Sequence, residues 1–203
     1  MIFCVDEYDV RVSGGAGLDV LVVDTTSGIT GDLAAMNVEL AFGNLGNDVL
    51  DAASAMDSVL IDGGDGDDVL RGGFSDDLII GGLGSDLTDG GLSFDSATYA
   101  GLLEDHLVSF DPSTGQYLVE NTSNADVDAL QRIEALTFGQ HLVWLSGVEI
   151  SAVNAAGEYR ELMIPRYLQV LQAMMSCTQK TAMTYCWVAT ETTLSAASTA
   201  TIT

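Results

Sequence analysis

The chain is poor in cysteine, proline, histidine and basic residues. Among 203 residues it has 3 cysteines, 2 prolines, 2 histidines and 6 lysines and arginines. Three cysteines cannot build the disulfide framework of a small secreted scaffold, although Cys177 and Cys186 could form one pair or remain free thiols. With 30 acidic residues and a net charge of −24, the chain should be repelled by nucleic acid and by anionic membrane surfaces.

Longer signals are missing as well. No run of 18 or more apolar residues occurs, so no membrane span is expected. Residues Met1 to Val10 carry Asp6, Glu7 and Asp9 and do not follow the pattern of a signal peptide. Neither His-Glu-x-x-His nor Gly-x-Ser-x-Gly is present, so we predict that this chain is not an enzyme.

Apolar residues, by contrast, are plentiful. They make up 47% of the chain and the mean hydropathy is +0.28, which is not the composition of a disordered acidic protein. Twelve of the acidic residues lie between Gly43 and Thr98, where Arg71 is the only basic residue. Carboxylates gathered around a bound cation would reconcile this local charge with a folded, apolar chain.

Glycine and aspartate recur in this region with a period of nine residues. The pattern is Gly-Gly-x-Gly-x-Asp followed by x-apolar-x, in contiguous copies at 63–71, 72–80, 81–89 and 90–98, with separate copies at 43–51 and 14–22. Residues 52–62 extend the frame by two residues and lack the glycines, so we interpret them as a degenerate coil that preserves the stacking.

Each nonapeptide has the residues of a calcium-binding turn followed by a short strand. Glycine adopts positive φ angles without a steric penalty, so backbone carbonyl groups can converge, and the aspartate adds a carboxylate oxygen. Calcium prefers six to eight oxygen ligands, whereas softer metals prefer the thiolates and imidazoles that the repeats lack. The central strand residues, such as Leu50, Leu70 and Ile79 and the smaller Thr88 and Ala97, are predicted to point inward and form a shared core.

The pattern changes after Thr98. His106–Phe110 and Gln116–Glu120 predict the two strands of a hairpin, and an alternating apolar pattern from Leu130 to Phe138 precedes a further strand at His141–Leu145. These strands predict an antiparallel β cap on the open end of the stacked coils.

The last part of the chain differs again. From Glu158 to Cys177 the apolar spacing predicts a short helix, and from Ala189 onward the serine, threonine and alanine content predicts a flexible tail.

The nonapeptides resemble the repeats-in-toxin (RTX) repeats of bacterial proteins exported by type I secretion, over roughly Gly14 to Leu145. The resemblance implies an all-β fold, namely a parallel β-roll (β-solenoid) with a C-terminal antiparallel cap, then a short helix and a tail. It divides the chain into degenerate leading coils with one RTX repeat at 14–22 (1–42), a calcium-binding roll (43–98), the cap (99–147) and a helix and tail similar to a type I secretion signal (148–203).

The resemblance also implies calcium ions held between repeat n and repeat n+2. Asp68 and Asp86 would share one ion, Asp77 and Asp95 a second on the other side of the roll, and Asp48 and Asp68 a third. The implied ligands are backbone carbonyl groups and aspartate side chains: Gly43, Leu45, Asp48, Gly63, Gly64, Asp65, Gly66, Asp68, Gly72, Phe74, Asp77, Gly82, Gly84, Asp86, Gly91, Ser93 and Asp95.

Two departures from the pattern concern the second of these sites. Ser75 and Ser93 replace the third glycine of their repeats, which weakens the predicted Asp77–Asp95 site because serine adopts the required backbone conformation less readily. Asp19 lacks a matching aspartate two repeats on, so no complete site is predicted there.

These expectations predict a secreted, extracellular bacterial module that folds on binding calcium, with calcium ions and the type I secretion machinery as partners. One alternative is the C-terminal secretion and folding module of a larger exported enzyme, such as a protease, a lipase or a polysaccharide epimerase. Another is a spacer in a surface adhesin, for which extracellular polysaccharide would be a partner.

Overall fold

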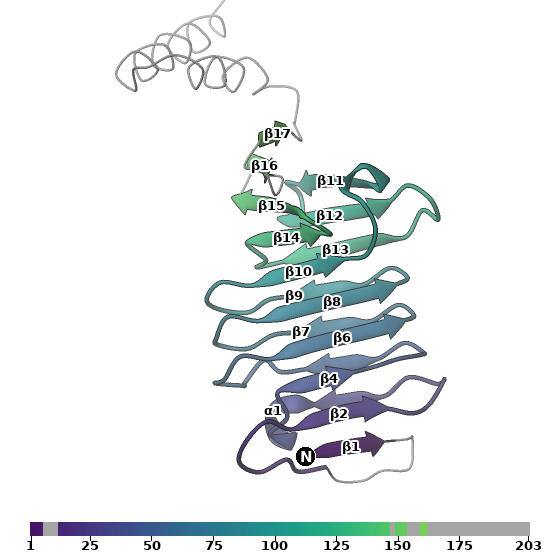
Figure 1. The fold of residues 1–203 in the computed structure, drawn as a ribbon, viewed down its shortest axis with the longest axis vertical. Helices are drawn as coiled ribbons and strands as arrows, with labels where there is room; N and C mark the ends of the chain where they lie inside the picture. The colour runs from purple at the N-terminus through teal and green to yellow at the C-terminus, as the bar shows by residue number, and fades with distance from the viewer. Residues whose placement is uncertain (6–11, 147–148, 154–158, 162–203) are drawn as a thin grey trace, which may run out of the picture. The chain divides into compact units, whose positions relative to one another are not determined.

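The chain winds back and forth between two β-sheets whose strands are mostly parallel (Figure 1). A computed structural model describes residues 1–5, 12–146, 149–153 and 159–161. Sheet A has ten strands and sheet B has seven, and the chain alternates between them from β2 to β10. The predicted all-β roll of parallel strands is confirmed.

Sheet A contains one strand from every coil and then three antiparallel strands. In sheet order they are β1 (Ile2–Val5), β2 (Val20–Val23), β4 (Leu40–Phe42), β6 (Leu60–Asp65), β8 (Leu78–Leu83), β10 (Ser96–Tyr99), β14 (Ala135–Phe138), β15 (His141–Ser146), β16 (Glu149–Val153) and β17 (Tyr159–Glu161). Sheet B runs in the order β11 (His106–Asp111), β12 (Gln116–Asn121), β13 (Val127–Gln131), β9 (Leu87–Asp89), β7 (Val69–Arg71), β5 (Val49–Asp51) and β3 (Thr30–Asp32).

Strand register shows how the nonapeptides build coils. Leu60 pairs with Leu78, which makes that coil 18 residues long (78 − 60), or two nonapeptides, one strand in each sheet. Leu40 pairs with Leu60, so the preceding coil is 20 residues long (60 − 40). The two extra residues fall in the turn between β5 and β6, and the turns on the opposite side of the roll keep their stacking.

The middle residue of each strand fills the space between the sheets. Leu50 and Leu70 from sheet B and Ile79 from sheet A are completely buried, and Thr88 and Ala97 are 3% exposed, as the repeat pattern predicts. Burial of each leucine or isoleucine side chain contributes about 1.5–3 kcal/mol, but only when neighbouring coils cover it. Stability is therefore collective along the roll.

The cap differs from the prediction in one respect. The β11–β12 hairpin is antiparallel, as expected, and it extends sheet B. The alternating apolar pattern from Leu130 to Phe138, however, contains two strands, β13 and β14, which pair in parallel with β9 and β10. Arg132, with φ of 50°, lies in the turn that carries the chain from one sheet to the other. The roll thus has a further coil beyond Thr98.

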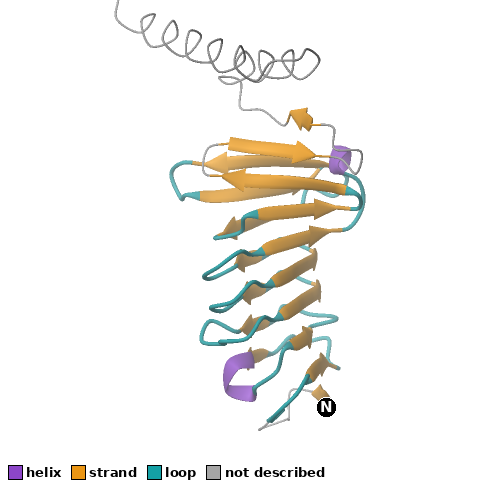
Figure 2. Ribbon diagram, turned by 60° about the vertical axis from the view of Figure 1, so that its left-hand side comes forward, coloured by secondary structure: helices purple, strands orange, loops and turns teal. Residues whose placement is uncertain are grey.

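Two helical segments also need correction. The irregular stretch Val23–Phe42 contains a short helix, α1 (Leu33–Met36), which is drawn in purple near the N-terminus in Figure 2. Its N-cap is Asp32, whose side chain accepts a hydrogen bond from the amide of Ala35 (2.9 Å). The helix predicted from Glu158 is wrong at its start, because Tyr159–Glu161 form β17. Its remaining residues and the predicted tail lie outside the described residues.

The fold contains no candidate for a transmembrane helix: none of the helices in the described part of the chain is long and apolar enough to cross a bilayer.

Candidate calcium centre

Buried carboxylates stack along one side of the roll, directly before the strands of sheet B. Each accepts a hydrogen bond through Oδ1 from the backbone amide of the matching residue one coil earlier. The amide of Asp48 donates to Asp68 (2.7 Å) and the amide of Asp68 donates to Asp86 (2.8 Å). The amide of Asp86 donates to Asp128 (2.9 Å), which continues the row into the cap. We call this row the first ladder.

A second ladder lies on the opposite side, directly before the strands of sheet A. The amide of Asp77 donates to Asp95 (2.8 Å), and the amide of Asp95 donates to Glu134 (2.8 Å). At the other end the amide of Asp19 donates to Glu39 (2.9 Å). Each carboxylate in both ladders therefore has one oxygen held by the backbone of its neighbour.

The other oxygen decides what the ladders can bind. On the first ladder, Oδ2 of Asp48, of Asp68 and of Asp86 is buried and has no hydrogen-bond partner. Leaving a buried acceptor without a partner costs about 1–3 kcal/mol, and more when the group is charged. A row of such oxygens is an electrostatic liability unless a cation lies between them.

The space next to these oxygens is kept open by glycine. A methyl group built on Gly43 would lie 2.6 Å from Oδ2 of Asp48 and 2.1 Å from the carbonyl oxygen of Gly63. One built on Gly63 would lie 2.2 Å from Oδ2 of Asp68 and 2.6 Å from the carbonyl oxygen of Gly81. We call the first space the lower gap, between turns 43–48 and 63–68, and the second the upper gap, between turns 63–68 and 81–86.

The polar atoms nearest to both glycines are carboxylate and backbone carbonyl oxygens. This donor set matches calcium, which is a hard cation that takes carboxylate and carbonyl ligands, and does not match a soft metal. The described residues contain no cluster of three or more acidic, histidine or cysteine side chains suited to a metal. A site in the gaps therefore depends on backbone carbonyl groups as much as on aspartates.

The backbone of the turns has the conformation that the repeat pattern requires. Gly64 and Gly66 have φ of 101° and 136°, and Gly82 and Gly84 have 114° and 117°, a region that side chains disfavour. Asn44 takes the second glycine position at φ of 65°. These angles let each turn lie directly on the one below.

The structure sorts the predicted ligands into two groups. One group lines the lower and upper gaps or their turns, and the other belongs to the second ladder; their roles as ligands stay predictions. The first group is Gly43, Leu45, Asp48, Gly63, Gly64, Asp65, Gly66, Asp68, Gly82, Gly84 and Asp86, and the second is Gly72, Phe74, Asp77, Gly91, Ser93 and Asp95.

Burial makes the carboxylates of the first ladder difficult to ionise. Desolvation, together with repulsion from neighbouring carboxylates, raises the pKa of Asp68 to about 6 and the pKa of Asp86 to about 7, although each amide hydrogen bond opposes the rise. Desolvation also raises the pKa of Asp48. A metal ion must displace these protons, so calcium binding here should weaken at acidic pH.

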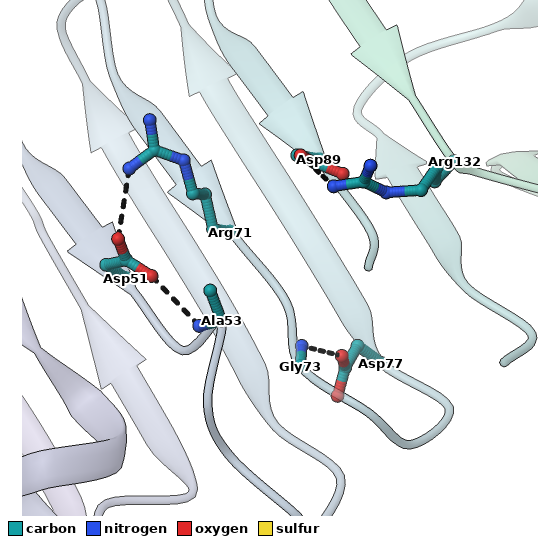
Figure 3. A network of polar contacts seen from close by, with 7 residues as sticks. All are labelled: Asp51, Ala53, Arg71, Gly73, Asp77, Asp89 and Arg132. Atoms are coloured by element: carbon teal, nitrogen blue, oxygen red, sulfur yellow. Dashed lines mark hydrogen bonds and ion pairs between the residues drawn. The ribbon is translucent and has the colours of Figure 1, made fainter. Parts of the chain in front are cut away.

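At the predicted Asp77–Asp95 site, protein groups already occupy oxygens that an ion would need. The amide of Gly73 donates to Oδ2 of Asp77 (2.6 Å), as Figure 3 shows. The hydroxyl of Ser93 donates to the carbonyl oxygen of Phe74 (2.9 Å), and Ser93 has φ of 81°. The two aspartates are brought together as predicted. The hydrogen bonds engage Oδ2 of Asp77 and the carbonyl oxygen of Phe74, whereas Oδ2 of Asp95 is buried without a partner.

Nearby basic side chains do not enter the gaps. Arg71 of β7 forms an ion pair with Asp51 of β5 at 3.0 Å (Figure 3). Arg132, in the turn after β13, forms an ion pair with Asp89 of β9 (Figure 3). These two arginines therefore leave the carboxylates of the first ladder uncompensated.

Sequence reasoning missed Asp128 and Glu134, which continue the two ladders. The long insertion hides them: Leu87 pairs with Ala129, so this coil is 42 residues long (129 − 87). A signal was present, since Asp128 precedes an x-Leu-x strand as the repeat aspartates do.

Residues 61–97 match four copies of the RTX calcium-binding nonapeptide repeat. No curated protein and no solved structure matches the chain. The matched residues include turns 63–68 and 81–86, which face each other across the upper gap. Sequence and geometry therefore agree that residues 61–97 are calcium-binding nonapeptide repeats of the RTX type.

Proposed function

We propose that the chain is a calcium-dependent folding module of a secreted bacterial protein. The observation that carries this proposal is the row of buried, unpartnered oxygens of Asp48, Asp68 and Asp86 on the first ladder. Bound calcium would supply positive charge to these oxygens and would accept the carbonyl groups of the turns as further ligands. The lower and upper gaps are the sites that we assign to it.

The energetics support a dependence of folding on calcium. Three unpartnered acceptors at about 1–3 kcal/mol each amount to about 3–9 kcal/mol. The total stability of a domain is usually about 5–15 kcal/mol. Without a cation the first ladder therefore opposes folding by an amount comparable to the whole stability, whereas an ion in each gap reverses the sign of this contribution.

This dependence suits export through a type I machinery. Extracellular calcium modules bind with dissociation constants of about 10⁻⁴–10⁻³ M, so the coils would stay unfolded where calcium is scarce and fold outside the cell. In this proposal the module acts by folding and has no catalytic activity of its own.

Far-UV circular dichroism of the whole chain during a calcium titration tests the proposal. We expect the β signal to appear with a midpoint of about 10⁻⁴–10⁻³ M calcium and to be lost in excess chelator. Magnesium at the same concentration is the control, because it binds reluctantly to sites that lack octahedral geometry. A full β signal in excess chelator would contradict calcium-dependent folding.

A second candidate function is that of a folding module within a larger exported enzyme. It is favoured by the outer strands β1 and β3, each of which pairs with only one other strand among the described residues. Such free strand edges can accept a further coil. Sequencing the gene region upstream of Met1 tests it: a continuous reading frame with a catalytic motif would support this candidate, and a stop codon in frame would exclude it.

A further inference from the structure

The outer face of sheet A carries a row of leucines. Leu40, Leu60 and Leu78 take matching positions in the neighbouring strands β4, β6 and β8, because Leu40 pairs with Leu60 and Leu60 pairs with Leu78 (Figure 1). The residue after each leucine points into the core, and Ala41 and Ile61 are completely buried there. The leucines therefore point outward, and they are only partly buried. Contiguous exposed apolar rows of this kind mark surfaces that bind a partner.

The row lines a shallow groove of about 400 Å³, which we call the leucine groove. Leu18, which is 65% exposed, and Phe94, which is 42% exposed, also line it. The ring of Phe94 contacts the ring of Trp144 (centroids 5.6 Å apart), and Trp144 is 41% exposed. The apolar surface thus continues from the repeats onto the cap strand β15.

The outer face of sheet B has a different character. There the outward residues at the ends of successive strands form a charged row of Asp51, Arg71 and Asp89. The corresponding row of sheet A consists of Phe42, Asp62 and Ile80. The same repeat builds both sheets, so the period alone does not require an apolar outer face on sheet A.

Charge at the leucine groove is negative. Glu39 and the exposed Asp76 line it, and no lysine or arginine is among its described lining residues. Arg71 and Arg132 are the only lysines or arginines whose side chains the structure describes, and both pair with aspartates of sheet B. The groove therefore favours an occupant that carries positive charge beside its apolar groups. A second copy of this chain is disfavoured, because each copy has a net charge of −24.

The dimensions of the groove suit an α-helix. Neighbouring strands lie about 4.8 Å apart, so the outward side chains repeat at about that interval. One helical turn rises about 5.4 Å, so a helix laid along the row would place about one apolar side chain on each strand. The lining residues span β4 to β10. Three strand spacings are about 14 Å, the length of a helix of about ten residues.

We propose that the leucine groove binds an amphipathic helix of a partner protein. Apolar residues of this helix at i, i+4 and i+7 pack on Leu40, Leu60 and Leu78, and lysines or arginines beside them lie close to Glu39 and Asp76. The inference goes beyond calcium-dependent folding but needs the folded roll, because three coils contribute to the row. In its calcium dependence it rests on the proposed function: without calcium the groove is not assembled.

A labelled synthetic peptide of about 14 residues, with leucine at the helical spacing and lysine elsewhere, is the probe. Fluorescence anisotropy measures its binding to the whole chain in saturating calcium. We expect Leu78→Gln to weaken binding by about tenfold or more. Leu87→Gln is the matched control and should leave binding unchanged, because Leu87 has the same repeat position on sheet B and is 47% exposed. The same peptide with glutamate in place of lysine should not bind.

Two further variants make the test independent of the leucine row. Phe94→Ala changes an exposed side chain in a turn and should also weaken binding. Asp76→Asn can keep the hydrogen bond that the amide of Phe94 donates to Oδ1 (3.0 Å), so it removes charge alone. We expect it to weaken binding of the lysine peptide severalfold, and by less at high salt.

The outcomes separate this inference from calcium-dependent folding. If the chain shows its β signal in calcium, but Leu78→Gln and Phe94→Ala bind the peptide as tightly as the natural sequence, the groove is not a docking site and the folding proposal stands. If the chain folds and binds the peptide equally well in chelator, the folding proposal alone fails. Should Leu78→Gln not fold in calcium, Phe94→Ala decides.

Two other occupants would overturn the inference. One is a second copy, shown by a dimer in calcium that Phe94→Ala dissociates in analytical ultracentrifugation. The other is a lipid surface, shown by sedimentation of the chain with phosphatidylcholine vesicles that Phe94→Ala abolishes. We expect a monomer that stays in solution in both experiments.

Discussion

Substitution of Asp68 by asparagine should change stability in opposite directions with and without calcium. Oδ2 of Asp68 borders the upper gap, and its Oδ1 accepts the amide hydrogen of Asp48, so this residue joins the two gaps. Asparagine has nearly the same shape and can keep the hydrogen bond through its own Oδ1. The change therefore removes charge at constant geometry.

In chelator at pH 8 the carboxylate of Asp68 is ionised, because its pKa is raised only to about 6. Asp68→Asn then removes a buried charge without a partner, and we expect residual structure to gain about 1–3 kcal/mol. In saturating calcium the same change removes a charged ligand. A loss of ten- to a hundredfold in affinity corresponds to about 1.4–2.8 kcal/mol of lost stability.

The assay is chemical unfolding followed by circular dichroism, in excess chelator and in 10-fold excess calcium over the midpoint of folding. Asp57→Asn, an exposed acidic residue in the turn between β5 and β6, is the matched control and should change stability little in either condition. If Asp68→Asn destabilised the chain equally with and without calcium, its role would be one of packing, and the electrostatic reasoning would be refuted.

Three further predictions concern the gaps. In chelator, raising the pH from 5 to 8 should destabilise the roll, because the pKa of Asp86 is raised to about 7 in the folded state, so protonation of Asp86 favours folding. Thermal unfolding at both pH values checks this, and a rise in stability with pH would contradict it. Gly63→Ala should abolish the calcium-induced β signal, since its Cβ would lie 2.2 Å from Oδ2 of Asp68, whereas Gly31→Ala, with its nearest contact at 3.6 Å, should keep the signal. The double change Ser75→Gly and Ser93→Gly should add one calcium ion per chain by calorimetry, because it frees carbonyl groups that the hydroxyls now hold. An unchanged number of ions would show that these hydroxyls are not what weakens the Asp77–Asp95 site.

The structure within each coil could be predicted from the sequence because each position of the nonapeptide requires a particular type of residue. Each repeat fixes a glycine turn, an aspartate and an inward apolar residue, so the burial of Leu50, Leu70 and Ile79 follows from the period alone. The pairing of Asp68 with Asp86 follows in the same way, since two nonapeptides make one coil.

The non-local part could not be predicted because it depends on where the chain returns. Asp128 reaches its place in the first ladder only after the β11–β12 hairpin, and no period connects it to Asp86. The hydroxyl of Ser93 was expected only to disturb a glycine turn, whereas it donates to the carbonyl group of Phe74. The repeat pattern shows that serine replaces glycine at position 93, but it does not show which hydrogen bond the serine hydroxyl forms.

The two ladders meet the same electrostatic problem with different chemistry. On the second ladder Oδ2 of Asp77 accepts a hydrogen from the amide of Gly73, and Asp19 forms an ion pair with the amino terminus of Met1 at 2.5 Å. On the first ladder Asp48, Asp68 and Asp86 have no such donor. On the second ladder, Oδ2 of Asp19 and Oδ2 of Asp95 are also buried without a hydrogen-bond partner. Calcium dependence should therefore be concentrated on the side of the roll that precedes sheet B.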